Sequence, residues 1–349
     1  MIRFIIRRLL YGVLVMLGII GVVFMLFMVL PDPARLTLGQ RADAATAEAV
    51  NRELGLDKPW HTQLRLYLND LSPLSIHADK EANREKYRYT RLIPIGDNVL
   101  TAKAPYLRRS YQSRREVSDI LWEALPKTAI LALTALLLAV VLGIPFGVFS
   151  ALNKYKLTDN VIMVIAVLGI SIPSFFSGIL ISWFFGFKLH EYTGLDMFGS
   201  LHEYDAYQWK VLDLKNLILP AITLGIRPLA IITQLTRSSM VEVLSQDYIR
   251  TAVAKGIGKR VLLYKHALRN ALNPVLTAVS GWLASLMAGA FFVEFIFDWK
   301  GLGLVTVNAL ATSDFPVVMG VVLLIGALFV AINIIVDVLY GVLDPRIRL

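Results

Sequence analysis

The sequence contains no cysteine and has a small share of charged side chains. The absence of Cys among its 349 residues excludes disulfide bonds, thiolate metal sites and cysteine nucleophiles. Only 17% of the residues are charged, whereas a soluble domain has about 25%. With 56% hydrophobic residues, the chain carries more apolar surface than one core can bury in water. The composition therefore argues against a soluble enzyme, a disordered regulator and a coiled coil.

Motifs that bind nucleotides or activate a nucleophile are also absent. The sequence closest to a P-loop, GIGKR, ends in Arg260 instead of Ser or Thr, and Val253 stands where the pattern needs Gly. No G-x-S-x-G turn is present. The zinc pattern H-E-x-x-H begins at His190 but fails at Gly194. We expect no catalytic residue, no metal site and no cofactor in this chain.

Long apolar runs dominate the sequence instead. A bilayer-spanning helix needs about 20 apolar residues. Five runs reach this length without a charge, and a sixth contains only Arg227 and Arg237 as charged residues. The six runs are 9–30, 128–153, 160–187, 216–241, 275–293 and 315–336. The sequence therefore predicts six transmembrane helices.

The distribution of basic residues predicts the orientation of these helices. Cytoplasmic loops are enriched in Lys and Arg. With the N-terminus inside, the inner segments carry 14 Lys and Arg and the short outer loops carry 4. The inner segments are 1–8, 154–159, 237–273 and 344–349, and the outer loops are 188–215 and 294–314. We expect both termini in the cytoplasm, and the net charge of +9 fits basic membrane faces better than nucleic-acid binding.

Three regions follow from this arrangement. Residues 1–30 form the N-terminus and first helix, read as a retained anchor because Pro-Asp-Pro follows it instead of a cleavage site. Residues 31–120 form an extracytoplasmic segment. Residues 121–349 form a five-helix core with a cytoplasmic loop at 242–273.

The extracytoplasmic segment has two parts. From Leu54 to Leu71, apolar residues at helical spacing (Trp60, Leu64, Leu68 and Leu71) predict an amphipathic helix. From Asp79 to Arg115, the sequence is polar without a sustained period, which predicts an irregular cap or a partly disordered stretch. A docking surface for an external partner and a family-specific decoration are both open interpretations.

The inner loop contains a short helix-forming stretch, Asp247 to Lys255, which is followed by Gly256. Its small residues allow close contact with another surface, and the glycine predicts a helix end. The stretch is either a docking helix for a cytoplasmic partner or an interfacial helix on anionic lipid, which seven basic residues in the loop region would also favour.

Prolines and isolated polar residues mark a possible pathway through the membrane. Proline within a span frees backbone groups, which suits either kinked helices around a cavity or ordinary packing. An intramembrane charge is a functional candidate, although Arg227 could equally be structural. The pathway candidates near proline breaks are Ser171, Ser174, Arg227 and Asn273.

Motifs along nearly the whole chain resemble those of one family. They include RRLL, LPAITLGI, LTRSSMVEVLSQDYIRTAVAKG, KHALRNALNPV, FDWKGLGLV and the final DPRIR. In these motifs the chain resembles the permease subunit of a type I ABC importer in the dipeptide, oligopeptide and nickel group, the B type of two paired permeases. It departs from the family pattern at Arg108, where a glycine is usual, and in a longer segment at 72–103.

The resemblance implies an all-α membrane protein with the six-helix fold of type I importer permeases and a large extracytoplasmic segment after the first helix. It implies a bacterial inner-membrane complex with a C-type permease, two ATP-binding cassette ATPases and an extracytoplasmic solute-binding protein. ATP and magnesium would bind to the ATPases. The implied cargo is a peptide or peptide-like solute, and nickel, glutathione and peptide antibiotics are alternatives.

The resemblance also assigns the inner helix as the coupling helix, which sits in a groove of an ATPase. Its coupling residues would be Asp247, Tyr248, Arg250, Thr251, Ala252, Ala254, Lys255 and Gly256. A standalone secondary transporter would favour buried ionisable residues and inverted repeats, and a membrane-embedded enzyme would need a catalytic constellation in its spans. The sequence offers little support for either alternative.

Overall fold

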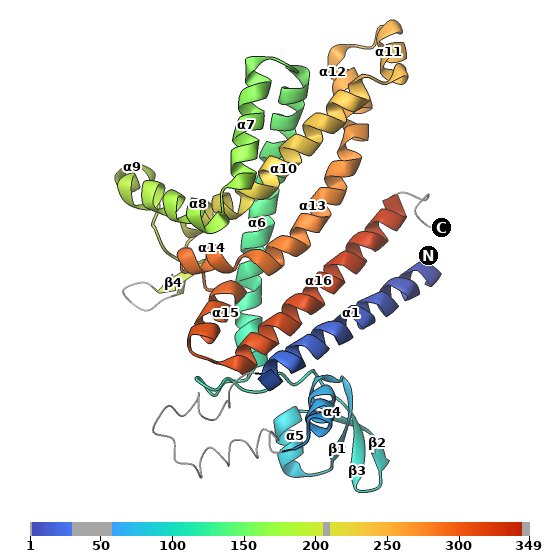
Figure 1. The fold of residues 1–349 in the computed structure, drawn as a ribbon, viewed down its shortest axis with the longest axis vertical. Coiled ribbons are helices and arrows are strands. Elements are labelled where there is room, and N and C mark those ends of the chain that lie inside the picture. Colours follow the sequence, from blue (N-terminus) through green and yellow to red (C-terminus); the bar gives the residue numbers. More distant parts are fainter. Residues whose placement is uncertain (1, 30–57, 205–209, 344–349) are drawn as a thin grey trace. The chain divides into compact units, whose positions relative to one another are not determined.

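The computed structural model describes residues 2–29, 58–204 and 210–343 (Figure 1). The chain divides into two compact units. The first comprises Met1–Leu9, Ala124–Leu304 and Leu328–Leu349, and the second comprises Leu10–Glu123 and Val305–Ala327. Four helices run from one unit into the other, namely α1 (Ile2–Val29), α6 (Val117–Leu152), α15 (Leu302–Ala311) and α16 (Phe315–Leu343).

The membrane-spanning helices agree with the predicted apolar runs. Five helical stretches of the described residues are long and apolar enough to cross a bilayer, and a sixth is a bent pair. The five are Ile5–Leu26, Val117–Leu152, Lys215–Leu244, Lys259–Ala288 and Phe315–Val338. The prediction of six spans is confirmed when the bent pair is counted as one. Helices suit this setting because they satisfy their own backbone hydrogen bonds in lipid.

The bent pair consists of α7 (Leu157–Ser171) and α8 (Ser174–Ile181), which continues into the π-helical η2 (Ser182–Lys188). The two halves meet at 107°. The break falls at Pro173, which has no backbone N–H to continue the helix. The predicted run 160–187 is therefore two helices at a large angle.

The fifth span begins earlier than its apolar run suggests. Helix α12 (Lys259–Val261) leads through the π-helical η4 (Leu262–Leu268) into α13 (Arg269–Gly289). The basic residues from Lys259 onward thus lie on a helix that leads into the span. The non-helical part of the inner loop is correspondingly short.

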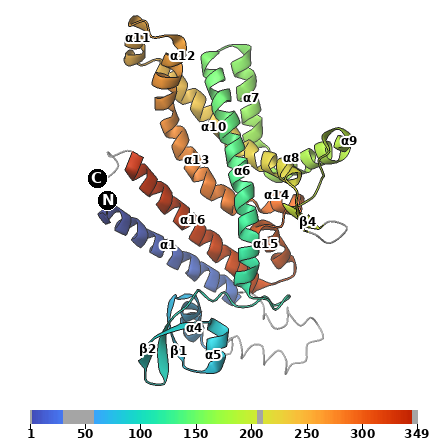
Figure 2. The same cartoon turned by 180° about the vertical axis from the view of Figure 1, so that it is seen from behind.

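Helix α10 (Ile218–Leu244) is the centre of the first unit. It packs against α7 and α8 on one side and α13 on the other, and α6 crosses it in both views (Figures 1 and 2). The approach of α6 to α10 is close because glycines replace side chains. A Cβ at Gly143 would lie 3.0 Å from the Leu229 carbonyl oxygen, and one at Gly225 would lie 2.9 Å from the Ala135 carbonyl oxygen. Small residues allow such contact between membrane helices.

A buried carboxylate, Glu294, holds the turn between α14 (Phe291–Ile296) and α15 (Leu302–Ala311). Its Oε1 accepts a hydrogen bond from the Thr128 hydroxyl at 2.7 Å, and its Oε2 accepts one from the Gly303 N–H at 2.7 Å. A Cβ at Gly301 would overlap Oε2 of Glu294 and the Thr128 hydroxyl, so a larger residue there would displace these side chains. The glycine at 301 thus lets the backbone come close to Glu294.

The remaining elements of the first unit are short. They are α9 (His190–Thr193), β4 (His202–Tyr204), β5 (Lys210–Leu212), η3 (Lys215–Leu217) and α11 (Asp247–Ala254). β4 and β5 form an antiparallel pair in which Glu203 lies opposite Val211.

The second unit contains a small antiparallel sheet that the sequence did not predict. Strands β1 (Leu74–Ala78), β3 (Asn98–Ala102) and β2 (Thr90–Ile95) lie side by side in that order, and α5 (Glu81–Tyr87) connects β1 to β2. The prediction of an irregular or disordered stretch at 79–115 is therefore wrong for residues 81–102, whereas residues 103–115 form no helix or named strand. The buried positions of β1 and β3 include the polar residues Ser75, His77 and Thr101, which hides the apolar and polar alternation of a half-buried sheet.

Helix α4 (Trp60–Leu71) confirms the predicted amphipathic helix over the described residues. Its packed face differs from the expected one. Leu64, Tyr67 and Leu71 pack together with α1 residues such as Phe24, whereas Trp60 is 60% exposed. Spacing of three and four residues places Leu64, Tyr67 and Leu71 on one face.

Asp70 at the end of α4 organises the polar contacts of this unit. Its Oδ1 accepts a hydrogen bond from the Tyr87 hydroxyl at 2.9 Å, and Arg108 Nε lies 3.8 Å from its Oδ2. The Lys103 ammonium donates to the Asp70 carbonyl oxygen. Burial lowers the pKa of Lys103, and burial together with the neighbouring carboxylate raises the pKa of Tyr87. Arg108, where the resemblance leads us to expect glycine, adopts a left-handed φ of 66°.

Replacing Gly147 by Ala should destabilise the first unit. The added Cβ would lie 2.5 Å from Thr236 Cβ and 2.7 Å from the Thr233 carbonyl oxygen, so α6 and α10 must separate. Overpacking of this kind costs about 1–3 kcal/mol. Thermal unfolding of the purified protein measures the change.

Gly281→Ala on α13 is the matched control, because a Cβ there meets nothing within 4 Å. This variant should be as stable as the wild type or slightly more stable, since alanine is the better helix former. Equal unfolding temperatures for the two variants would contradict the close contact of α6 with α10.

Candidate coupling helix and substrate cavity

The predicted coupling stretch is a helix, α11, which follows α10 after Ser245 and Gln246. Asp247 in its first turn complements the positive end of the helix dipole. At its other end, the Gly256 N–H donates to the Val253 carbonyl and the Ile257 N–H donates to the Ala252 carbonyl, at 2.9 and 3.2 Å. This pattern is a Schellman cap, and Gly256 supplies the left-handed φ of 74° that the cap requires.

One side of α11 packs onto its own chain and the other side is exposed. Ile249 is buried in a cluster with Met240, Ala267 and Ala271, and Ala252 is buried beside it on the helix. The other residues predicted to couple are exposed, namely Asp247, Tyr248, Arg250, Thr251, Ala254, Lys255 and Gly256. Ala252 therefore faces inward, and the remaining seven residues form an exposed surface, which we call the outer face of α11.

A buried ion pair fixes α10 shortly before it leads into α11. Arg237 on α10 donates from Nε and Nη2 to the two carboxylate oxygens of Asp159, both at 2.6 Å. Asp159 also accepts from the Ser150 hydroxyl at 2.5 Å and the Tyr155 N–H at 3.0 Å. These bonds tie α10 to the end of α6 and the start of α7. Arg237, which interrupts the fourth apolar run, is thus a structural residue.

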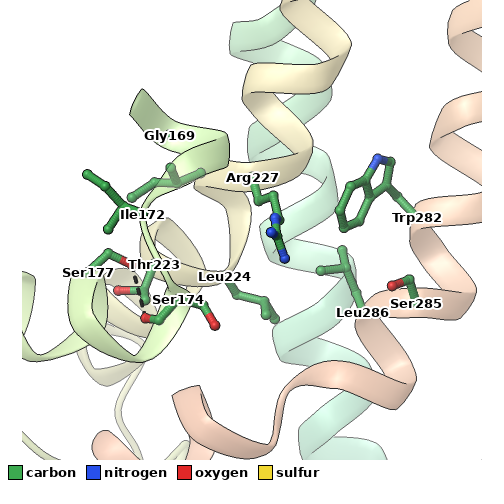
Figure 3. Close-up of a pocket in the computed structure, with 11 residues that line it drawn as sticks. Gly169, Ile172, Ser174, Ser177, Thr223, Leu224, Arg227, Trp282, Ser285 and Leu286 are labelled. Carbon is green, nitrogen blue, oxygen red and sulfur yellow. Dashed lines mark hydrogen bonds between the residues drawn. The ribbon is translucent and has the colours of Figure 1, made fainter. Parts of the chain in front are cut away.

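A cavity of about 150 Å³ lies between α7, α8, α10 and α13 (Figure 3). Figure 3 shows Arg227 extending from α10 toward the space that faces Trp282 and Ser285 of α13. The lining residues are Gly169, Ile172, Ser174, Ser177, Thr223, Leu224, Ile226, Arg227, Trp282, Ser285 and Leu286. The break at Pro173 and the proline-containing α10 shape this opening.

Two of the four predicted pathway residues line the cavity. Ser174 and Arg227 do, whereas Ser171 and Asn273 do not. The Ser171 hydroxyl donates to the Val167 carbonyl at 2.9 Å, a bond within its own helix. Sequence reasoning missed Trp282 and Ser285 of α13, although their spacing of three residues places both on one helix face.

The described residues contain no group of three or more His, Asp or Glu side chains that could hold a metal ion. The His190 ring makes a local contact instead, with its Nδ1 2.7 Å from the Leu195 carbonyl oxygen. This contact stabilises the turn after α9.

Asp159→Asn should destabilise the protein strongly, because it leaves the Arg237 charge without its partner. Breaking a buried ion pair typically costs about 3–5 kcal/mol. Glu123→Gln is the control, since it removes an exposed pair with Arg115 that is worth about 0–1 kcal/mol. Thermal unfolding of both variants measures the difference. Loss of similar size in both variants would show that Asp159 and Arg237 do not anchor α10.

Comparison with known proteins identifies the family. Residues 143–349 match the binding-protein-dependent transport system inner membrane component family, and residues 1–132 match the N-terminal region of such membrane components. The chain is 34% identical to the dipeptide transport system permease protein DppB of Alkalihalophilus pseudofirmus, over all of both chains. It is 35% identical to the glutathione transport system permease protein GsiC of Escherichia coli, covering 100% of this chain and 99% of GsiC.

These matches extend over both units, and the spans, α11 and the FDWKGLG turn all lie within them. The chain therefore belongs to the family of binding-protein-dependent transport system inner membrane components, and it is a multi-pass permease subunit of an ABC importer with the type I permease fold.

Proposed function

We propose that this permease conducts peptides or peptide-like solutes inward as one half of a transmembrane pathway. The relatives named for dipeptide and glutathione transport support this cargo, since glutathione is itself a small peptide. A C-type permease would form the other half, and an extracytoplasmic solute-binding protein would deliver the cargo.

The outer face of α11 is the observation that carries the proposal. It presents seven exposed residues on a short capped helix that α10 holds in place. Separate ATP-binding cassette ATPases would receive this face and supply the energy, with ATP and magnesium bound to them. ATP can drive transport only if it changes the relative free energies of two conformations. A rigid helix that joins the ATPase to the spans could transmit that difference.

We place α11, the turn before α7 and both termini in the cytoplasm. The 14 Lys and Arg of the proposed inner segments, against 4 in the short outer loops, support this orientation. The small sheet, together with α4 and α5, would then lie outside the membrane and face the solute-binding protein.

The cavity also bears on the choice of cargo. Arg227 lines it and neither Asp, Glu nor His does. Nickel requires nitrogen, oxygen or sulfur ligands and is repelled by a nearby cation. The cavity therefore favours a peptide over nickel as the solute.

Ala254→Trp should uncouple transport, because the large ring on the outer face of α11 would obstruct docking to an ATPase. Uptake by cells that carry the complete transport system should fall at least tenfold, and less ATPase should co-purify with the permease. Lys156→Trp, on the exposed turn before α7, is the control and should leave both unchanged. Normal uptake and normal co-purification of the Ala254 variant would refute the coupling role of α11.

The assembled importer in proteoliposomes should accumulate radiolabelled trialanine only when the binding protein and ATP are supplied. The chain alone should not accumulate it on a proton or sodium gradient, because its energy would come from the ATPases. Uphill uptake by the chain alone would identify it as a secondary transporter. Uptake of nickel but not of any peptide would refute the proposed cargo.

A further inference from the structure

Every polar side chain that lines the cavity carries a hydrogen-bond donor, and none is a carboxylate. These donors are the Arg227 guanidinium, the indole N–H of Trp282 and the hydroxyls of Ser174, Ser177, Thr223 and Ser285. The Ser177 and Thr223 hydroxyls donate to carbonyls of their own helices, at 3.0 and 2.9 Å. A cavity with one cation, several donors and no carboxylate favours an anionic ligand.

Arg227 is not neutralised by the part of the chain that the structure describes. Its only hydrogen bond there joins Nη2 to the Ile170 carbonyl oxygen at 3.5 Å, and no carboxylate pairs with it. Arg237 on the same helix differs from Arg227, because two of its guanidinium nitrogens donate hydrogen bonds to the carboxylate of Asp159. Keeping a charge within a span is costly, so an unpaired arginine there indicates a functional role.

Three further donors in the cavity also lack a partner among the described residues. Neither the Ser174 hydroxyl, the Ser285 hydroxyl nor the Trp282 indole N–H forms a hydrogen bond there. Figure 3 shows these side chains around the space into which Arg227 extends. They come from α8 and α13, so the two helices and α10 converge on one small region.

We propose that this cavity holds the carboxylate end of the transported solute, with Arg227 selecting the negative charge and Ser174, Ser285 and Trp282 orienting it. This inference rests on the proposed function. Arginine binds a carboxylate through two parallel N–H donors, which gives both affinity and direction. The volume of about 150 Å³ suits one end of a peptide, since a pocket for a whole drug-sized ligand exceeds about 300 Å³.

The first test measures the charge preference of the cavity and needs no knowledge of the cargo. The chain has no cysteine, so Ser285→Cys introduces a single thiol beside Arg227. In the assembled importer, this thiolate displaces sulfinate from a methanethiosulfonate reagent and forms a mixed disulfide. The rates are compared for an anionic sulfonatoethyl reagent and a cationic trimethylammonioethyl reagent. Their ratio is independent of the thiolate fraction, because both react with the same sulfur.

Adding Arg227→Gln should lower the anionic-to-cationic rate ratio about tenfold, whereas Arg227→Lys should largely preserve it. Arg65→Gln, an exposed arginine of α4, is the matched control and should leave the ratio unchanged. An unchanged ratio in the Arg227→Gln variant would overturn the proposal.

The second test uses uptake of trialanine and of its C-terminal amide by importers with Ser285 intact. Arg227→Gln should lower trialanine uptake about tenfold, because a hydrogen bond to a charged group is lost, and should change uptake of the amide by less than twofold. Binding of both peptides to the solute-binding protein serves as the control and should not change. Equal loss of uptake for both peptides would overturn the carboxylate role.

The two tests separate this proposal from the peptide assignment. If the reagent ratio falls as expected but the wild-type importer takes up neither peptide, the anion preference of the cavity is supported and the peptide cargo is refuted. If both peptides are taken up and the ratio does not respond to Arg227, the peptide cargo is supported and the anion site is refuted.

Discussion

The close contact between α6 and α10 is the constraint on which the rest of the first unit depends. Glycines at 143, 147 and 225 remove the side chains that would hold these helices apart, and backbone oxygens occupy the space. In lipid, helices gain little from hiding apolar surface from one another, so close packing must hold them together. Helix α10 is accordingly the most buried of the candidate spans. Both functional features of the unit depend on α10, because α11 follows its end and its residues line the cavity.

Two arginines on α10 illustrate how one helix serves two tasks. Arg237 forms an ion pair with Asp159 and so fixes the end of α10 from which α11 extends. Arg227 lies ten residues earlier, about 15 Å along a helix, and extends into the cavity. A displacement applied at α11 would therefore reach the cavity through one continuous helix. This geometry links the proposed ATPase contact to the proposed solute contact.

Much of this architecture could be predicted from the sequence, because the length of an apolar run is set by the thickness of the bilayer. The capped helix Asp247–Ala254 could also be predicted, since its glycine signal is local. The cavity could not, because Trp282 and Ser285 approach Arg227 only after α8, α10 and α13 have packed. The inward direction of Ala252 and the small sheet were missed for related reasons. Ala252 is oriented by Ile249 and its buried neighbours. The short strands bury the polar residues Ser75, His77 and Thr101, so their sequences show no apolar and polar alternation.

The sharp turn between α7 and α8 has a consequence for how the protein is made. The two halves of this segment meet at 107°, so the folded protein does not hold it as a single straight rod. Its second half fits against residues that the ribosome adds later, since a Cβ at Gly178 would lie 3.4 Å from Thr223 and 3.3 Å from Ile296. The packing of α8 in this bent segment therefore depends on α10 and α14, which the ribosome adds only after α7 and α8 have been made.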